Sequence, residues 1–342
     1  MAIAMALLMF GCDVCDLGEG DGNGEYSVYF TAVPLNSDIP GIFTVSEDGT
    51  GLHEIINNGI LYSPPAANGR IAFMQTDLAS GENQIVIAGI DGSNPEVIVR
   101  ENALWDISFP ILSPDGARIA FYGGRKELWL VNVSDATVNR ITSNFADGTL
   151  PAFSPDGGRL VFFENVEGGV RLAMVNTFGN QNKLTLDYDL TLIDYRGESR
   201  ISWAQGGSRI AFSLTSGEAD YLVLVDGDLN ELSRIRIDYP GVFMPDISAT
   251  GEKVIFTAPD NGSLWLADLS GESPKFRDLT GSAAGEINLY PTWSDDGKYA
   301  LFNKSYADDP EHSYNTLFII EPSTRKISVL SNNAYRGYFR KN

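Results

Sequence analysis

The sequence has only two cysteines, Cys12 and Cys15, and none after residue 15. No disulfide can therefore cross-link a core that lies in the rest of the chain. The pair has Cys-x-x-Cys spacing, but no alternation of strand and helix surrounds it, which argues against a thiol redox motif. Histidine is equally scarce, with His53 and His312 the only two.

Basic residues are also few. The chain has 24 Lys and Arg against 45 Asp and Glu, a net charge of −21. Such a charge repels phosphate backbones, so we expect no nucleic-acid partner. There is no Gly-rich phosphate loop leading into a helix, no Gly-x-Ser-x-Gly nucleophile motif and no helical periodicity sustained over ten residues. These absences argue against nucleotide-binding and α/β-hydrolase folds.

The residues from Ala2 to Phe10 are uniformly apolar, a run that is too short for a membrane span but suits a signal-peptide core. Gly11-Cys12 follows it, an arrangement that resembles a bacterial lipoprotein cleavage site. We predict a signal peptide at 1–11, lipidation of Cys12 and a flexible Gly-rich acidic tether at 12–25. An ordinary secretory signal, or a hydrophobic segment without a targeting role, stays open as an alternative.

A turn followed by a strand organises the rest of the chain. Ser113-Pro-Asp-Gly-Ala-Arg-Ile-Ala-Phe121 recurs as Ser154-Pro-Asp-Gly-Gly-Arg-Leu-Val-Phe162. Ser, Pro, Asp and Gly are the residues of a tight turn, and the alternating β-branched and aromatic residues indicate a half-buried strand. Looser copies of this strand end at Phe30, Phe73, Phe212, Phe256 and Phe302.

Three further strands accompany each copy, and the unit recurs about every 45 residues. Four short antiparallel strands at this period are typical of a β-propeller blade. We predict an all-β protein with seven four-stranded blades, six blades being the alternative. The first copy lacks an innermost strand, so we expect residues 334–339 to pair with 26–31 and close the ring.

The Ser-Pro-Asp-Gly-x-Arg-Ile-Ala-Phe copies resemble the repeat of TolB-like propellers, also called the WD-like repeat. The resemblance covers residues 26–342 and implies the propeller fold, but no particular activity. Some relatives carry a serine peptidase domain, and some lyases hold a metal with several histidines. His312 lies among Asp308, Asp309 and Glu311, which we interpret as a solvated acidic loop rather than a metal site.

We therefore expect no cofactor, no metal and no catalysis, and a monomer that is exported to the bacterial cell envelope. There it would bind a protein, peptide or glycan. A metal-dependent lyase or hydrolase at the propeller mouth, or a purely structural module, remains an alternative. Long connections between strands, and the Trp, Tyr and Arg residue types that dominate binding hot spots, favour a ligand-binding surface. We expect this surface to comprise Trp105, Tyr195, Arg196, Arg200 and Tyr290. The competing interpretation is that these side chains only plug blade junctions.

Overall fold

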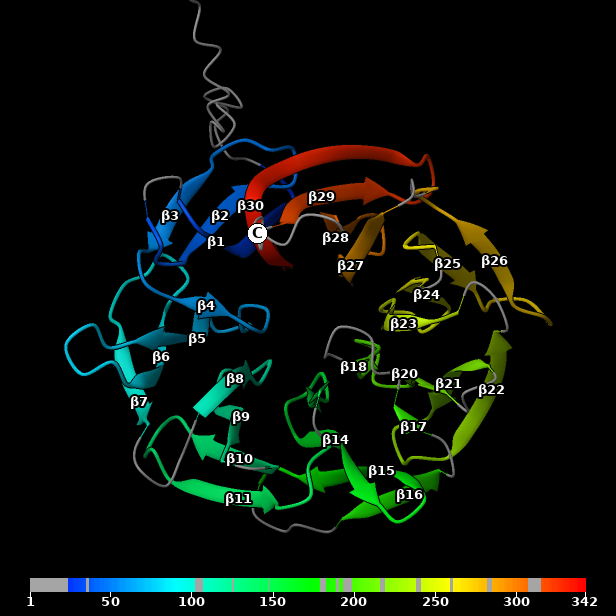
Figure 1. Ribbon diagram of the computed structural model, residues 1–342, viewed down its shortest axis with the longest axis horizontal. Coiled ribbons are helices and arrows are strands. Elements are labelled where there is room, and N and C mark those ends of the chain that lie inside the picture. Colours follow the sequence, from blue (N-terminus) through cyan, green and yellow to red (C-terminus); the bar gives the residue numbers. More distant parts are fainter. Residues whose placement is uncertain are drawn as a thin grey trace, which may run out of the picture.

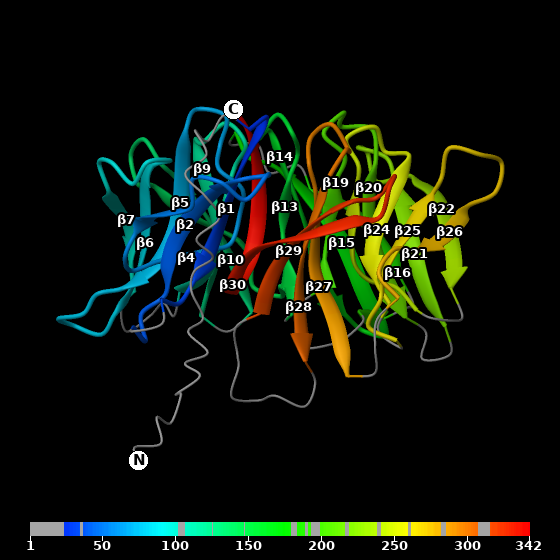
Figure 2. The same ribbon diagram turned by 90° about the horizontal axis from the view of Figure 1, so that it is seen from above.

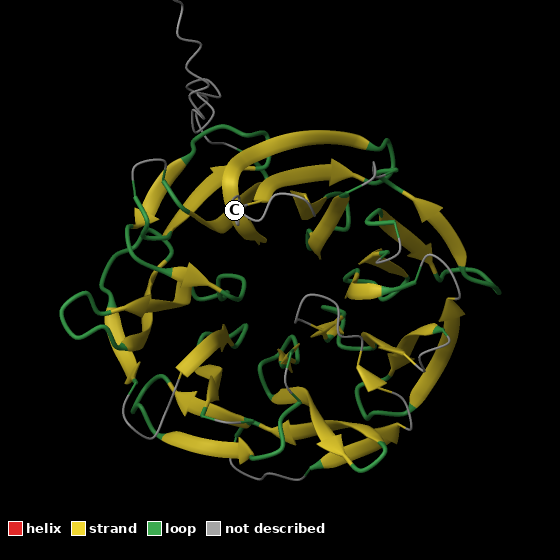
Figure 3. Ribbon diagram, viewed as in Figure 1, coloured by secondary structure: helices red, strands yellow, loops and turns green. Residues whose placement is uncertain are grey.

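The computed structural model describes residues 24–34, 37–101, 107–124, 126–146, 148–178, 183–188, 191–192, 199–215, 219–237, 241–258, 261–281, 285–306 and 315–342. In these ranges the chain forms strands and turns, without a helix, that surround a central axis (Figure 1, Figure 3). The all-β prediction is confirmed. Over the same residues there is no helix with the length and apolar character needed to cross a membrane.

Most strands fall into four-stranded antiparallel groups in sequence order. The first group has β1 (Tyr26–Ala32), β2 (Gly41–Ser46) and β3 (His53–Ile56), and the end of the last strand of the chain completes it. The next groups in the first half of the chain are β4 (Ile60–Leu61), β5 (Arg70–Thr76), β6 (Asn83–Gly89) and β7 (Glu96–Arg100); β8 (Ile107–Leu112), β9 (Arg118–Gly123), β10 (Glu127–Asn132) and β11 (Val138–Thr142); β13 (Ala152–Phe153), β14 (Arg159–Val166), β15 (Gly169–Asn176) and β16 (Leu184–Tyr188).

The second half continues this pattern. Its strands are β19 (Ser202–Trp203), β20 (Ile210–Thr215), β21 (Asp220–Val225) and β22 (Glu231–Ile237); β23 (Phe243–Ile247), β24 (Lys253–Thr257), β25 (Leu264–Asp268) and β26 (Lys275–Asp278); β27 (Glu286–Trp293), β28 (Ala300–Tyr306), β29 (Asn315–Glu321) and β30 (Lys326–Lys341). Three short strands lie between groups: β12 (Thr149–Leu150) pairs in parallel with β18 (Ser199–Arg200), and β17 (Thr191–Leu192) pairs with β20.

The long strand β30 joins the two ends of the ring. Its first part pairs with β29 as an outermost strand, and its last part pairs with β1 as an innermost strand. The register runs from Tyr26 opposite Lys341 to Ala32 opposite Ala334. The predicted pairing of 334–339 with 26–31 is therefore confirmed, and the strand order is the one expected for seven blades.

The repeated turn has the chemistry that its sequence predicts. In the copy at 113–118, the Ser113 hydroxyl accepts a hydrogen bond from Arg118 N at 2.9 Å and donates one to Asp115 Oδ1 at 2.5 Å. The next copy repeats these bonds, and its Ser154 hydroxyl and Gly158 N–H hold the pKa of Asp156 below its usual range. The turn aspartates are thus structural residues, as their recurrence indicated.

The closing phenylalanine of each second strand is buried between blades. All seven side chains are at most 1% exposed: Phe30, Phe73, Phe121, Phe162, Phe212, Phe256 and Phe302. Each sits in an apolar cluster, and most of these clusters combine strands of adjacent blades, such as β6 with β9. Burying one such side chain contributes about 2 kcal/mol, so the ring is stabilised mainly by blade-to-blade packing.

The arginine of the repeat links one blade to the next. Arg118 lies 4.1 Å from the centre of the Phe178 ring, and Arg159 Nη1 donates to Gly227 O at 2.5 Å. Arg209 Nη1 likewise donates to Gly251 O at 2.8 Å. A long side chain with several donors can reach carbonyl oxygens and rings of a neighbouring turn, which gives this repeat position a structural role.

Candidate ligand-binding channel

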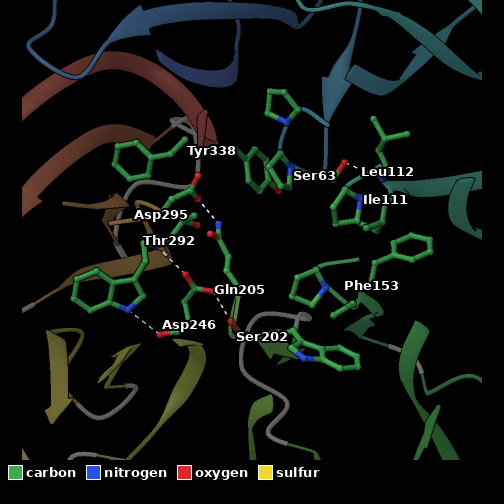
Figure 4. Close-up of a pocket in the computed structure, with 18 of the residues that line it drawn as sticks. Ser63, Ile111, Leu112, Phe153, Ser202, Gln205, Asp246, Thr292, Asp295 and Tyr338 are labelled. Carbon is green, nitrogen blue, oxygen red and sulfur yellow. Dashed lines mark hydrogen bonds between the residues drawn. The ribbon is translucent and has the colours of Figure 1, made fainter. Parts of the chain in front are cut away.

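A cavity of about 670 Å³ lies along the axis of the ring, between the innermost strands (Figure 4). Every blade contributes to its wall. One lining residue from each blade, in ring order, is Tyr338, Ser63, Ile111, Ala152, Ser202, Asp246 and Thr292. Residues of the turns between first and second strands, such as Gln205 and Asp295, also line it. Because these turn residues line it, the cavity extends to the face of the ring that carries the turns. The C-terminal end of the chain lies at this face (Figure 2).

Asp246 on β23 is the centre of a polar network in the wall. Its side chain is 9% exposed and accepts hydrogen bonds from the Ser202 hydroxyl at 2.6 Å and from Trp293 N at 2.8 Å. The Trp293 indole donates to Asp246 O at 3.0 Å, and Arg200 Nη2 lies 3.4 Å from Asp246 Oδ1. A carboxylate that is nearly buried needs such donors and a cation, and here they come from the neighbouring blades.

Arg200 also spans the wall beyond its own blade. Its Nη1 donates to Pro291 O at 2.8 Å and to Thr292 Oγ1 at 3.2 Å. Nearer the face that carries the turns, Gln205 Nε2 donates to Asp295 Oδ1, again between residues about ninety positions apart. These contacts connect the blade of β19 with that of β27 across the intervening blade, and so fix the shape of this side of the cavity.

Arg336 on β30 lies among four aromatic rings. Its guanidinium carbon is 4.8 Å from the ring centre of Tyr290, 5.0 Å from Tyr335, 5.1 Å from Tyr62 and 6.0 Å from Phe109. The Tyr290 and Tyr335 hydroxyls are 3.1 Å apart. Arg336 is 2% exposed, so the attraction between its charge and the ring faces acts in a water-poor environment, where it is strongest.

Bulges in the innermost strands place several of these side chains. Phe109, Met244, Tyr290 and Arg336 all have a positive φ near 50°, at points where the pairing with the second strand skips residues. Pro or Gly follows each of them. Such a bulge turns one side chain away from the regular alternation of the strand. Arg336 and Tyr290 thereby reach the axis.

Two of the five predicted surface residues, Arg200 and Tyr290, line the cavity. Trp105, Tyr195 and Arg196 lie outside the described residues, as do Cys12 and His312. The binding role of all five stays a prediction. Tyr290 also packs against Tyr335 and Arg336, which agrees with the competing interpretation of a plug at a blade junction.

Sequence reasoning missed most of the cavity wall, including Asp246, Arg336, Arg340 and Lys341. Arg336 could have been found from the sequence repeat. It has the same repeat position in the closing strand as Arg200 and Tyr290 have at the start of their innermost strands. Asp246 gave no signal, since carboxylates are common throughout this acidic chain. Its role depends on donors that are more than forty residues away in sequence.

The acidic loop of Asp308, Asp309, Glu311 and His312 lies outside the described residues. Within the described residues, no three His, Cys, Asp or Glu side chains gather in a way that could hold an ion. His53 is exposed at the start of β3, with Nδ1 2.8 Å from Gly51 O. It is an exposed polar residue at the junction of a turn and a strand.

Comparison with known proteins agrees with this architecture. The family model described as PD40, TolB beta propeller domain, matches residues 63–334. No curated protein matches the chain. Among solved structures, TolB from Acinetobacter baumannii is 18% identical with a TM-score of 0.53, over 92% of this chain and 82% of that one.

Two further structures extend the likeness of fold. The β-propeller domain of the Trilobed protease from Pyrococcus furiosus has a TM-score of 0.62 at 13% identity, over 91% of this chain and 93% of that one. Its description reports an open velcro topology, whereas here β1 and β30 pair. Oligogalacturonate lyase from Vibrio parahaemolyticus has a TM-score of 0.51 at 14% identity, over 77% and 72% of the two chains. With a family match over most of its length and the strand order of a propeller, the chain belongs to the TolB β-propeller family.

Proposed function

We propose that this protein is a non-catalytic binding protein that takes an extended segment of a protein partner into its central channel. The observation that carries the proposal is the cavity of about 670 Å³ walled by every blade. Its volume is in the range of ligand sites, and walls held by blade-to-blade hydrogen bonds form a largely preformed surface. A preformed surface loses little conformational entropy on binding.

The composition of the wall favours a peptide. Its aromatic residues include Tyr62, Phe153, Trp203, Tyr290 and Trp293, and Tyr and Trp dominate binding hot spots. Five prolines also line it: Pro64, Pro65, Pro114, Pro151 and Pro155. Proline donates no backbone hydrogen bond, so these positions offer apolar surface and carbonyl groups to an incoming chain.

The geometry gives less support to an enzyme, although one similar structure is described as a lyase. Among the described residues of the wall the carboxylates are Asp246 and Asp295, and both accept hydrogen bonds from side chains of other blades. Carboxylates held by such donors maintain the wall. The sequence-based alternative of a metal-dependent lyase or hydrolase therefore ranks second.

Blocking the cavity should abolish binding while the protein stays folded. Gln205 is exposed in the turn after β19 and points toward Asp295 (Figure 4), so Gln205→Trp would place an indole in the opening. The test starts with dodecapeptides that are selected from a displayed random library for binding to the wild-type protein. These peptides should bind Gln205→Trp at least about tenfold more weakly, a loss of about 1.4 kcal/mol of binding free energy.

The matched control is Leu232→Trp, which adds the same ring on the outer strand β22, where Leu232 is 51% exposed. Its peptide affinity should equal that of the wild type. Peptides that bind Gln205→Trp as well as the wild type, or a library that yields no binder, would contradict the proposal.

We also propose that the protein is exported to the cell envelope and anchored through Cys12. The support is the apolar run before Gly11-Cys12 and the Gly-rich segment after it. A tether of this kind would let a propeller reach partners away from a membrane surface.

Mass spectrometry of the protein isolated from its native cells tests this proposal. The expected N-terminal peptide begins at Cys12 and carries acyl chains. Cys12→Ser should abolish the lipid and shift the protein from the membrane fraction to the soluble fraction. A peptide that retains Met1 would contradict export, and a mature terminus beyond residue 12 would contradict anchoring but agree with secretion.

A further inference from the structure

The wall of the channel has a charge opposite to that of the whole protein. The chain has 24 basic and 45 acidic residues, yet the described residues that line the cavity include four basic side chains and two acidic ones. The basic ones are Arg200, Arg336, Arg340 and Lys341, and the acidic ones are Asp246 and Asp295. An anion that approaches is repelled at long range by the chain as a whole and attracted only within the channel.

The two acidic groups are already engaged by the wall itself. Asp246 accepts bonds from Ser202 and Trp293 and lies beside Arg200. Asp295 accepts a bond from Gln205. Their charges are thus partly balanced by donors that are in place before any ligand arrives.

Three of the four basic residues belong to the closing strand β30. Arg336 lies in the aromatic cluster, whereas Arg340 and Lys341 come at the end of the strand, near the face that carries the turns (Figure 2). The Lys341 side chain is 60% exposed, with Nζ 3.9 Å from Glu25 Oε1, a distance at which the pair is loosely held. A ligand that enters from this face passes Arg340 and Lys341.

We propose, on the basis of the proposed peptide-binding function, that the channel selects an acidic peptide segment and that Arg340 and Lys341 at the end of β30 recognise its carboxylates. Charge-assisted hydrogen bonds from Arg and Lys to carboxylates are stronger than neutral ones.

The test uses three fluorescently labelled, end-capped probes: hexaglutamate, hexaglutamine and hexalysine. Hexaglutamate should bind most tightly, although the protein carries a net charge of −21. The double variant Arg340→Gln with Lys341→Gln should bind it at least about tenfold more weakly. Raising the salt concentration should weaken binding to the wild type more than to this variant.

The control is the double variant Lys275→Gln with Lys326→Gln, which changes the net charge by the same amount on the exposed outer strands β26 and β30. Its affinity for hexaglutamate should equal that of the wild type, and thermal melts should show that both double variants are folded. Equal losses in the two double variants, or preference for hexalysine or hexaglutamine, would overturn the inference.

The displayed library separates this inference from the function on which it rests. Enriched peptides rich in Asp and Glu would support both. Neutral or basic peptides that Gln205→Trp no longer binds would leave the binding function standing and overturn acidic selectivity. A library without any binder would contradict the binding function, and this inference with it.

Discussion

Removal of residues 334–342 should lower the free energy of unfolding by at least about 4 kcal/mol, a large fraction of the roughly 5 to 15 kcal/mol by which a folded domain is typically stable. The deleted segment forms the innermost strand beside β1 and buries Tyr338 and Phe339, each 6% exposed. Its loss exposes apolar surface of the neighbouring blades. It also leaves the backbone groups on the inner edge of β1 without hydrogen-bond partners, while the other edge stays paired with β2. Denaturant unfolding followed by circular dichroism measures the effect.

Deletion of Asn342 alone is the matched control. Its side chain accepts a bond from the Ser27 hydroxyl at 2.7 Å and donates one to Gly24 O at 2.9 Å, both at the exposed end of the strand. This deletion should cost no more than about 1 kcal/mol. A truncation at residue 333 that unfolds at the same denaturant concentration as the full chain would show that the ring does not depend on closure by β30.

Arg336→Met should lower the free energy of unfolding by about 2 to 4 kcal/mol. Methionine keeps an apolar stem but removes the charge from the centre of the Tyr62, Phe109, Tyr290 and Tyr335 rings. Each buried cation–π contact contributes about 0.5 to 2 kcal/mol, and several are lost together. These rings come from three different blades and the closing strand, so the change weakens the contact between the closing strand and the rest of the ring.

Arg140→Met provides the comparison. The guanidinium of Arg140 lies 5.9 Å from the Trp129 ring centre but is 54% exposed, so solvent screens the interaction and the loss should stay below about 1 kcal/mol. Arg336→Lys should retain part of the stability, because it keeps the charge without the planar group that stacks on rings. Equal losses for Arg336→Met and Arg140→Met would refute the importance of the buried cluster.

The sequence predicted the fold in detail because each blade is encoded locally. The Ser-Pro-Asp-Gly turn, the alternating strand after it and the closing phenylalanine lie within about ten residues of one another, and the same pattern recurs. Local hydrogen bonds such as that from Arg118 N to Ser113 Oγ depend only on this spacing. Even the pairing of the two chain ends could be predicted, since the first repeat lacks one strand and the last segment has a spare one.

The channel could be predicted only in part, because its wall is made of single residues from every blade. Arg200 and Tyr290 were chosen for their place at the start of innermost strands, and that place does bring them to the cavity. Arg340 and Lys341, by contrast, lie at the end of the chain, where basic residues are common in exposed tails. Nothing in their neighbours along the sequence indicates a channel.

The sequence by itself thus determined the blade, its repetition and the closure of the ring, because turn chemistry and hydrophobic alternation act between near neighbours. Only the tertiary structure decided which side chains meet at the axis. The bulges turn Arg336 and Tyr290 inward, and donors from other blades surround Asp246. The contacts between blades join residues that are more than forty positions apart in the sequence, and they form only when the ring is closed.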